Sequence, residues 1–227
     1  MENNEIKRIL ISKGVHRLYH VNTVVTACTY LSQGGLLSRA ETERRHLPQT
    51  KQKSDTIDKF LGIYNDIFFD SVDIHQHAQI MNNYGAVTFV FDVGVLDEAK
   101  DAPVKITKSN PINWGLLGNP SEEGYFNDPD SLMQDFKATS FDQHITIHNI
   151  SGCLPFAEHL KDIILDDADD PTHPEFLQAQ KVLSAKIQAL HLGISLTIRK
   201  CPEACDCHRK YRETKPGFRY YRFRTHL

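Results

Sequence analysis

The sequence predicts an α+β fold in a single domain. Strand-like and helix-like segments follow one another along the 227 residues without the regular strand–helix–strand repeat of a doubly wound sheet. The chain also contains neither a glycine-rich dinucleotide loop nor a Walker sequence, which excludes the commonest nucleotide-binding folds. Its length and its 40% hydrophobic content suffice to bury one core. We place the main domain at residues 1–198 and a basic segment, packed on this domain or extending it, at residues 199–227.

The first elements follow from local signals. Residues 6–12 fit a short helix or strand, and residues 15–21 form the first clear strand. Asn22 is a good N-cap for the helix that follows. Apolar side chains recur in that helix at helical spacing: Val24, Val25, Cys28 and Leu31. Gly34 and Gly35 are expected to end it through positive φ angles.

The middle of the chain alternates between polar loops and apolar strands. Residues 38–60 are charged and polar, which predicts a solvent-facing loop with helical pieces. After an apolar and aspartate-containing block at 63–72, residues 86–93 form the strongest strand, because β-branched and aromatic side chains dominate them. Residues 97–140 are rich in turn formers, and we expect Trp114 to anchor an irregular loop there.

The last third is expected to hold two strands and two helices. Residues 144–148 alternate between polar and apolar and predict a strand. Residues 155–164 are assigned to a short helix, 175–192 to a long helix with one apolar face, and 194–198 to a strand. Between the two helices lies a cluster of carboxylates, for which a solvated acidic turn is the favoured interpretation: Asp166, Asp167, Asp169 and Asp170.

Bulk properties limit the compartment and the partners. No run of apolar residues approaches the roughly 20 needed to cross a bilayer, and the first residues are too acidic and polar for a signal peptide, so we expect a cytoplasmic protein with no membrane partner. Five cysteines, an odd number, do not indicate a secreted disulfide framework. The net charge of −3 does not mark the whole chain as a nucleic-acid binder.

The segment from residue 18 to residue 39 is the most informative. A short strand delivers His20 to a helix start, and a double-glycine turn then leads to Ser38 and Arg39. This order resembles the opening of the ADP-ribosyltransferase fold. It is most similar to the DarT-type nucleic-acid ADP-ribosyltransferases, toxins that modify bases using NAD. The resemblance spans residues 15–165 and implies a split, strongly bent sheet with helices.

The resemblance also implies a set of NAD-binding residues. His20, beside Asn22, matches the histidine expected to grip the nicotinamide amide, and Arg39, after Ser38, matches a phosphate-facing arginine. Arg44 and Arg45 are alternatives for this arginine, of which the turn favours Arg39. The aromatic and aspartate-rich segment 64–75 is similar to a family region that lies along the NAD pocket. From this segment we assign to the cofactor Tyr64, Asp70, Asp73 and His75.

The sequence departs from the family where the catalytic glutamate is expected. Residues 141–147 resemble that strand, but Gln143, His144 and Ile145 include no glutamate. Asp142 or His144 would have to do its work together with His20 and Arg39, and a neutral histidine is a competent base near pH 7. Three alternatives stay open: the mechanism differs, a carboxylate such as Asp70 or Asp73 points in from elsewhere, or the protein is not an active transferase.

The C-terminal segment combines basic and aromatic residues, which suits phosphate contact and base stacking. We assign to nucleic-acid binding Arg209, Lys210, Arg219 and Arg222. The alternative is an amphipathic strand over residues 218–224, with its aromatic face on the core and its arginines in solvent.

Four residues of this segment also have zinc-ligand chemistry: Cys201, Cys205, Cys207 and His208. Their spacing lacks a Cys-x-x-Cys pair, so zinc remains a possibility that we do not favour, and reduced cysteines in a surface turn are the preferred interpretation. His75 and His77 have a two-residue spacing that also fits a metal, but no third ligand is evident near them.

The sequence therefore predicts an NAD-dependent ADP-ribosyltransferase that modifies a base of single-stranded DNA or RNA. A role as a toxin or phage-defence effector, with an antitoxin protein as a partner, follows from the resemblance. Two alternatives remain: a ribonuclease toxin with His20, His75 and His144 as acid and base, and a catalytically silent nucleic-acid-binding module.

Overall fold

The main sheet has four strands. The computed structural model describes residues 1–116, 123–167, 170–201, 203–213 and 217–226. The strand order is β1 (Arg17–Asn22), β4 (Val87–Asp92), β8 (Leu160–Asp166), β9 (Leu196–Arg199). The β1–β4 and β4–β8 pairs are antiparallel and the β8–β9 pair is parallel. Central β4 is buried over five consecutive residues, as a strand covered on both faces requires.

A second sheet meets the first near one end of β1. It is antiparallel, with the order β3 (Ile67–Phe69), β6 (Ile145–Ile147), β5 (Val104–Ile106). Among the described residues, a single bridge joins the sheets, in which Tyr19 and Asp70 exchange two backbone N–H···O bonds of 2.9 Å. A two-stranded ribbon of β2 (Gly35–Leu37) and β7 (Cys153–Pro155) completes the strands of the described residues. The predicted α+β fold with a split sheet is confirmed.

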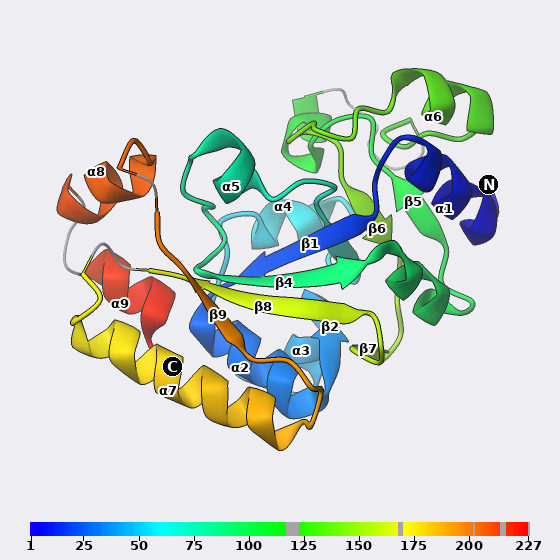
Figure 1. The fold of residues 1–227 in the computed structure, drawn as a ribbon. Coiled ribbons are helices and arrows are strands. Elements are labelled where there is room, and N and C mark those ends of the chain that lie inside the picture. Colours follow the sequence, from blue (N-terminus) through cyan, green and yellow to red (C-terminus); the bar gives the residue numbers. More distant parts are fainter. Residues whose placement is uncertain (117–122, 168–169, 202, 214–216, 227) are drawn as a thin grey trace.

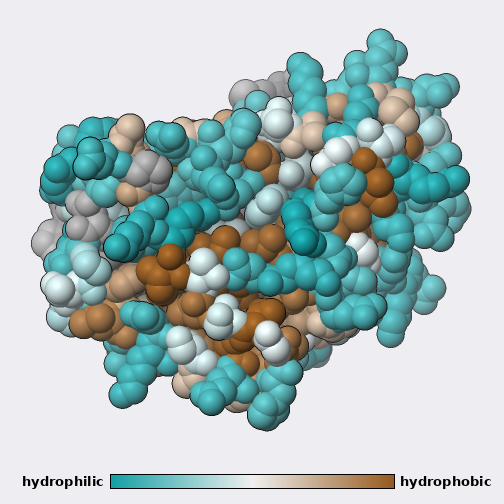
Figure 2. All heavy atoms as spheres, viewed as in Figure 1, coloured by the Kyte–Doolittle hydropathy of each residue, from teal (hydrophilic) through white to brown (hydrophobic). Residues whose placement is uncertain are grey.

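Helices cover the main sheet. Figure 1 shows α2 (Val24–Gln33) and α7 (Pro174–Ala189) side by side, with α9 (Gly217–Phe223) beside the N-terminal end of α7. α1 (Asn3–Ser12) packs on the 3₁₀ helix η1 (Val93–Ala99). The other helices are short: α3 (Arg39–Arg44), α4 (Asp55–Phe60), α5 (Ile74–Ala78), η2 (Pro111–Leu116), α6 (Pro129–Asp135) and α8 (Asp206–Glu213). Figure 2 shows apolar side chains gathered over β8, β9 and α2, surrounded by hydrophilic ones.

Three sequence predictions of secondary structure are wrong. The helix expected at 155–164 is replaced by the end of β7 and most of β8, because its apolar side chains are buried between β4 and β9. The turn-rich stretch 97–140 contains β5, which was not predicted. The amphipathic strand considered for 218–224 is instead helix α9.

The boundaries of the first long helix also differ from the prediction. Asn22 remains in β1, and Thr23 is the N-cap residue of α2. Gly34 ends the helix with a φ of 70°, as expected. Gly35 begins β2 instead, and a Cβ atom there would lie 2.2 Å from the carbonyl oxygen of Leu154, so glycine allows the close approach of β7.

The C-terminal segment packs on the rest of the molecule. α9 lies against α7 and α2, and Arg199, the first residue of the segment, is the last residue of β9 in the main sheet. In the described part of the chain, no helix combines the length and the apolar character needed to cross a membrane.

Candidate active site

A cavity of about 150 Å³ opens where the two sheets separate. One water molecule needs about 10–15 Å³ measured in this way, so the space exceeds a packing defect and admits part of a ligand. Its wall comes from β1, β3, the chain around α4, the start of η2, and His144 just before β6. Segments far apart in the sequence therefore share one site.

His20 lies at the wall with both ring nitrogens engaged. Nδ1 lies 2.8 Å from the carbonyl oxygen of Phe68, which only accepts, so Nδ1 carries the proton. Nε2 lies 3.1 Å from Nδ2 of Asn22 and accepts its hydrogen bond. Burial lowers the pKa of His20, against a smaller raising effect of the Phe68 hydrogen bond, so the ring is neutral. A ligand amide can bond to His20 only by replacing Asn22.

Asn22 and Tyr30 form a buried polar group behind His20. The Asn22 side chain, 3% exposed, accepts a hydrogen bond from Gln52 at 3.3 Å and lies 3.5 Å from the Tyr30 hydroxyl. The Tyr30 ring is 5.6 Å from that of His20, and burial raises the pKa of Tyr30 to about 12. This group fixes the imidazole and keeps a protonated phenol at the cavity.

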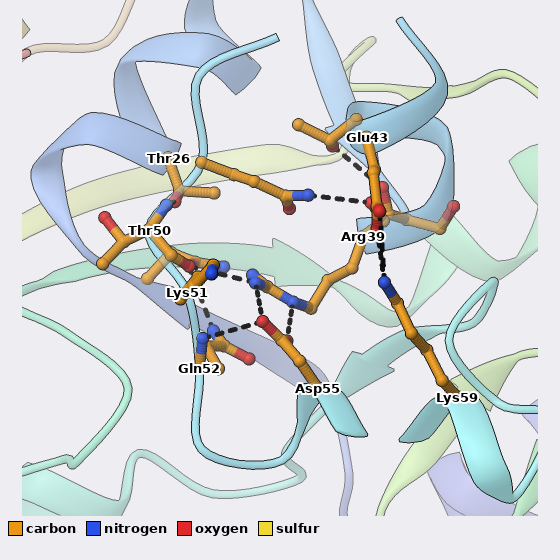
Figure 3. Close-up of polar contacts among 12 residues, drawn as sticks. Thr26, Arg39, Glu43, Thr50, Lys51, Gln52, Asp55 and Lys59 are labelled. Atoms are coloured by element: carbon orange, nitrogen blue, oxygen red, sulfur yellow. Dashed lines mark hydrogen bonds and ion pairs between the residues drawn. The ribbon is translucent and has the colours of Figure 1, made fainter. Parts of the chain in front are cut away.

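Arg39 presents a buried guanidinium whose bonding is incomplete. Nε and Nη2 both bond the carboxylate of Asp55, and Nη2 also donates to the carbonyl oxygen of Thr50 at 3.0 Å, as Figure 3 shows. Nη1 is buried and has no hydrogen-bond partner among the described residues. Burial alone would lower the pKa of Arg39, but the Asp55 carboxylate raises it, so the group keeps its charge. A buried N–H donor without a partner is costly, and an oxygen of a bound anion would satisfy it.

His144 and Asp70 form a hydrogen-bonded pair at the same wall. Nδ1 of His144 lies 3.0 Å from Oδ1 of Asp70, and the two side chains are 13% and 15% exposed. Because a carboxylate accepts, Nδ1 donates, and Nε2 keeps a lone pair able to take up a proton. The ring of Phe68 packs edge-on against His144, with centroids 6.2 Å apart. This is the arrangement of a general base held by an orienting carboxylate.

Two further carboxylates line the cavity, and the sequence analysis did not assign them to it. Burial raises the pKa of Asp58 to about 6, so this group changes charge close to neutral pH. Asp66 is buried and bonds Nδ1 of His148 at 3.0 Å and the Asn149 N–H at 2.9 Å. Nothing local in the sequence marks Asp58, because its character comes from burial by distant segments.

Tyr64 is the last of the predicted residues at the cavity. The Lys59 ammonium lies 4.5 Å from the centre of its ring. Burial and a hydrogen bond to Glu43 raise the pKa of Tyr64 to about 12. The structure thus brings together six of the assigned residues: His20, Asn22, Arg39, Tyr64, Asp70 and His144.

Four assigned residues lie outside the cavity wall, and these assignments are corrected. Ser38 caps α3 and donates to Asn65 at 2.8 Å, and Asp142 is an exposed residue of the loop before β6. Asp73 caps α5 and pairs with Arg199. His75 is 3% exposed and faces Asp166 and three thiols, because α5 turns it away from the cavity.

The predicted nucleic-acid residues have different environments. Arg222 is 1% exposed and donates to Tyr211 Oη and to two backbone carbonyls, so its assignment as a phosphate contact is wrong. Arg209 and Lys210 both pair with Asp206 on α8. Arg219 lies 5.3 Å from the Tyr211 ring centre. The predicted role in nucleic-acid binding stays a prediction for these three.

The cysteines of the C-terminal segment are not in a surface turn. Cys205 and Cys207 are 3% and 2% exposed, and together with Cys201 they surround His75. His208 is not part of this group, and its Nε2 lies 3.4 Å from the carbonyl oxygen of Cys201.

No family model and no curated protein matches this sequence. Among solved structures, the chain is similar to Thermus sp. 2.9 DarT in complex with ADP-ribosylated ssDNA, with a TM-score of 0.49 and 13% identity over 82% of this chain and 95% of that one. The complex of Thermus sp. 2.9 DarT with NAD+ gives a TM-score of 0.46 and 12% identity, and the match covers 82% of this chain and 96% of that one. The complex with carba-NAD+ gives a TM-score of 0.44 and 11% identity, and the match covers 83% of this chain and 96% of that one.

Proposed function

We propose that the cavity binds NAD+ and that the protein transfers ADP-ribose to a base of a single-stranded nucleic acid. The observation that carries the proposal is the buried Nη1 of Arg39, which has no partner among the described residues and belongs to a cavity-lining side chain. A charged guanidinium with a free N–H at a cavity suits a phosphate oxygen of a dinucleotide.

The other cavity residues suit the rest of such a substrate. The neutral His20 can accept a hydrogen bond at Nε2 from an amide that replaces Asn22 there, and the Tyr30 and Phe68 rings supply an apolar wall. The sequence order around His20 and Arg39, which resembles the DarT-type enzymes, supports the same ligand.

The reaction follows from the charges and the bases at the wall. The bond between the ribose carbon and the nicotinamide nitrogen breaks, and its electron pair leaves with neutral nicotinamide. A nucleophilic nitrogen of the acceptor base then forms a bond to the same carbon, and Nε2 of His144 takes the proton that this nitrogen loses. Asp70 holds His144 in the required tautomer, and its negative charge stabilises the positive ribose centre and the imidazolium that forms.

This arrangement replaces the glutamate that the sequence lacks. Asp142, one of the two residues considered for that role, is exposed and outside the cavity, whereas His144 lies at the wall beside Asp70. We therefore assign proton transfer to His144 and electrostatic stabilisation to Asp70.

A histidine ribonuclease has less support. His20 and His144 share the cavity, but His75 lies in the cysteine cluster, so the three histidines do not converge. Both ring nitrogens of His20 are also engaged, which leaves no second acid or base in that set.

The wider role that we propose is that of a toxin or phage-defence effector controlled by an antitoxin. Transfer of a bulky charged group to nucleic acid would block replication or translation. Expression of the wild-type chain is then expected to arrest bacterial growth, and expression of the His144→Gln variant is expected to allow it.

The direct test incubates the purified protein with NAD+ and short single-stranded DNA or RNA and follows the oligonucleotide mass. We expect a gain of one ADP-ribose unit on one of the two and release of nicotinamide. Shortened oligonucleotides without that gain would indicate a nuclease, and unchanged oligonucleotides and NAD+ would indicate a silent binding module. Either result overturns the proposal.

A further inference from the structure

A second cluster of chemically active side chains lies away from the cavity. It consists of His75 on α5, Cys201 just after β9, and Cys205 and Cys207 at the start of α8. One ligand atom from each residue lies within 4.8 Å of the others. We propose that these four residues hold one Zn²⁺ ion in a structural site.

The distances fit a single tetrahedral ion. Nε2 of His75 lies 3.3 Å from the sulfur of Cys201, 3.2 Å from that of Cys205 and 3.1 Å from that of Cys207. With Zn–N of about 2.0 Å and Zn–S of about 2.3 Å, a regular tetrahedron separates N and S by about 3.5 Å. The nitrogen therefore needs to move away from each sulfur by only a few tenths of an ångström to make room for the ion, and all four ligand atoms already lie within 4.8 Å of one another.

Hydrogen bonding alone explains the cluster poorly. Nδ1 of His75 donates to Oδ2 of Asp166 at 2.6 Å, since a carboxylate accepts. Nε2 then has one lone pair if the imidazole is neutral and one hydrogen if it is protonated, yet three sulfur atoms crowd around it. Either form can make one good hydrogen bond in that direction. One cation bound by the nitrogen and all three sulfurs accounts for the convergence.

The surroundings of His75 are those of a metal ligand. Asp166 is 1% exposed and is held in turn by Nε of Arg199 at 2.6 Å. Arg199 also pairs with Asp73, whose side chain accepts a hydrogen bond from the Gln76 N–H and caps α5. The carboxylate fixes the tautomer and the orientation of the imidazole, as carboxylates commonly do for histidines bound to zinc.

The ligand set indicates a structural ion. Three cysteines and one histidine fill all four positions of a tetrahedral zinc, whereas a catalytic zinc keeps one position for water or substrate. Cys205 and Cys207 are also buried, as is usual for the ligands of a structural ion. The ion would tie α5 to a segment 126 residues further along the chain and so anchor α8 against β8 and β9.

The test is the metal content of the full-length protein. Purified in a buffer without added metal, the wild-type chain is expected to hold one zinc per chain by elemental mass spectrometry. The Cys207→Ser and His75→Ala variants are expected to hold less than a tenth of that amount. Two matched controls are expected to keep the full content: Cys153→Ser, a thiol outside the cluster, and His208→Ala, the neighbouring histidine.

A second measurement covers variants that fail to fold. The wild-type chain is unfolded, stripped with a chelator and refolded with Co²⁺ alone, and its visible spectrum is recorded. Thiolate-to-cobalt charge transfer and the intense bands of a tetrahedral ion are expected, together with a higher melting temperature than that of the stripped chain. Zinc-free wild-type protein, bound iron, a disulfide among these cysteines, or a melting temperature unaffected by chelator would each overturn the proposal. None of these readouts requires transferase activity.

Discussion

His144 donates a hydrogen bond from Nδ1 to Oδ1 of Asp70, 3.0 Å away, and both side chains line one cavity. The pair joins the loop before β6 to the end of β3, so the second sheet itself sets its geometry. If His144 is the base of the transfer reaction, this contact decides the rate.

Replacement of His144 by glutamine is therefore expected to lower the kcat of ADP-ribose transfer by about 10²- to 10⁴-fold, the usual worth of a positioned base. Asp70→Asn is expected to have a smaller effect. The matched control is His159→Gln, because His159 bonds Asp92 at 2.9 Å with a side chain 14% exposed, close to the 13% of His144, but away from the cavity. Equal loss in both histidine variants would show a stability effect and remove His144 from the mechanism.

The Arg39→Lys variant tests the phosphate contact. Lysine keeps the charge but lacks the planar fork that serves Asp55, Thr50 and a ligand at once. We expect the KM for NAD+ to rise about tenfold or more, which corresponds to roughly 1.4 kcal/mol of lost binding, with kcat much less affected. Arg45→Lys is the control, because Arg45 pairs with Glu41 outside the cavity. An unchanged KM in Arg39→Lys would mean that the substrate phosphates lie elsewhere.

The raised pKa of Asp58 is expected to make the stability of the folded protein depend on pH. Its folded pKa of about 6 lies above the ordinary aspartate value of 3.8, so the folded chain holds the proton more tightly than the unfolded chain and loses stability as the pH rises from about 4 to above 6. The Asp58→Asn variant avoids this loss. It should be more stable than wild type at pH 8, by on the order of 1 to 3 kcal/mol, and similar to it at pH 4. Thermal unfolding at both pH values measures the difference, with exposed Asp101→Asn as the control. The same difference at both pH values would contradict the burial of Asp58.

Gly85 packs directly against the end of β1. A Cβ atom there would lie 2.0 Å from the carbonyl carbon of Asn22, and backbone cannot yield as a side chain does. Gly85→Ala is expected to destabilise the protein by on the order of 3 kcal/mol, and the melting temperature should fall by roughly 10 °C. Gly217→Ala meets no atom within 4 Å and should leave the melting temperature unchanged or slightly higher. A normal melting temperature for Gly85→Ala would mean that β1 and the chain before β4 are further apart.

Arg222 is expected to act as a structural residue. It donates to the backbone carbonyls of Asn82 and Gly85 at 2.7 and 2.5 Å, and Arg222→Met would leave both unpaired. We expect a loss of about 3 kcal/mol and no specific loss of affinity for single-stranded DNA once folded protein is compared. Exposed Arg212→Met is the control. Weaker DNA binding by a fully stable Arg222→Met protein would restore Arg222 to the nucleic-acid surface.

The predictability of the fold varied with the strength of the local pattern. The alternation at 144–148 and the β-branched run at 86–93 each correspond to a strand, β6 and β4. β8 was missed because its run of consecutive apolar residues has no period of two and reads equally well as part of a helix. Only its place between β4 and β9 decides the matter, and that is tertiary information.

The site was predictable where its residues belong to one short motif. His20 and Arg39 lie 19 positions apart in one motif, and both line the cavity. Asp58 gave no signal, since its pKa depends on burial by other segments. His75 was placed with the wrong partners because its sulfur neighbours follow at least 126 residues later, beyond any spacing rule for metal ligands. Arginine is usually a surface residue, so the sequence predicts an exposed Arg222, and only the packing of the folded chain shows that it is buried.

The bridge between Tyr19 and Asp70 consists of one residue pair, yet it fixes the position of β1, which holds His20, relative to Asp70 at the end of β3. Because this connection has only two backbone hydrogen bonds, we expect it to open locally more often than the six-residue β1–β4 pairing. The amide hydrogens of Tyr19 and Asp70 should therefore exchange with deuterium sooner than those of central β4, and a bound dinucleotide that spans this connection should slow them selectively.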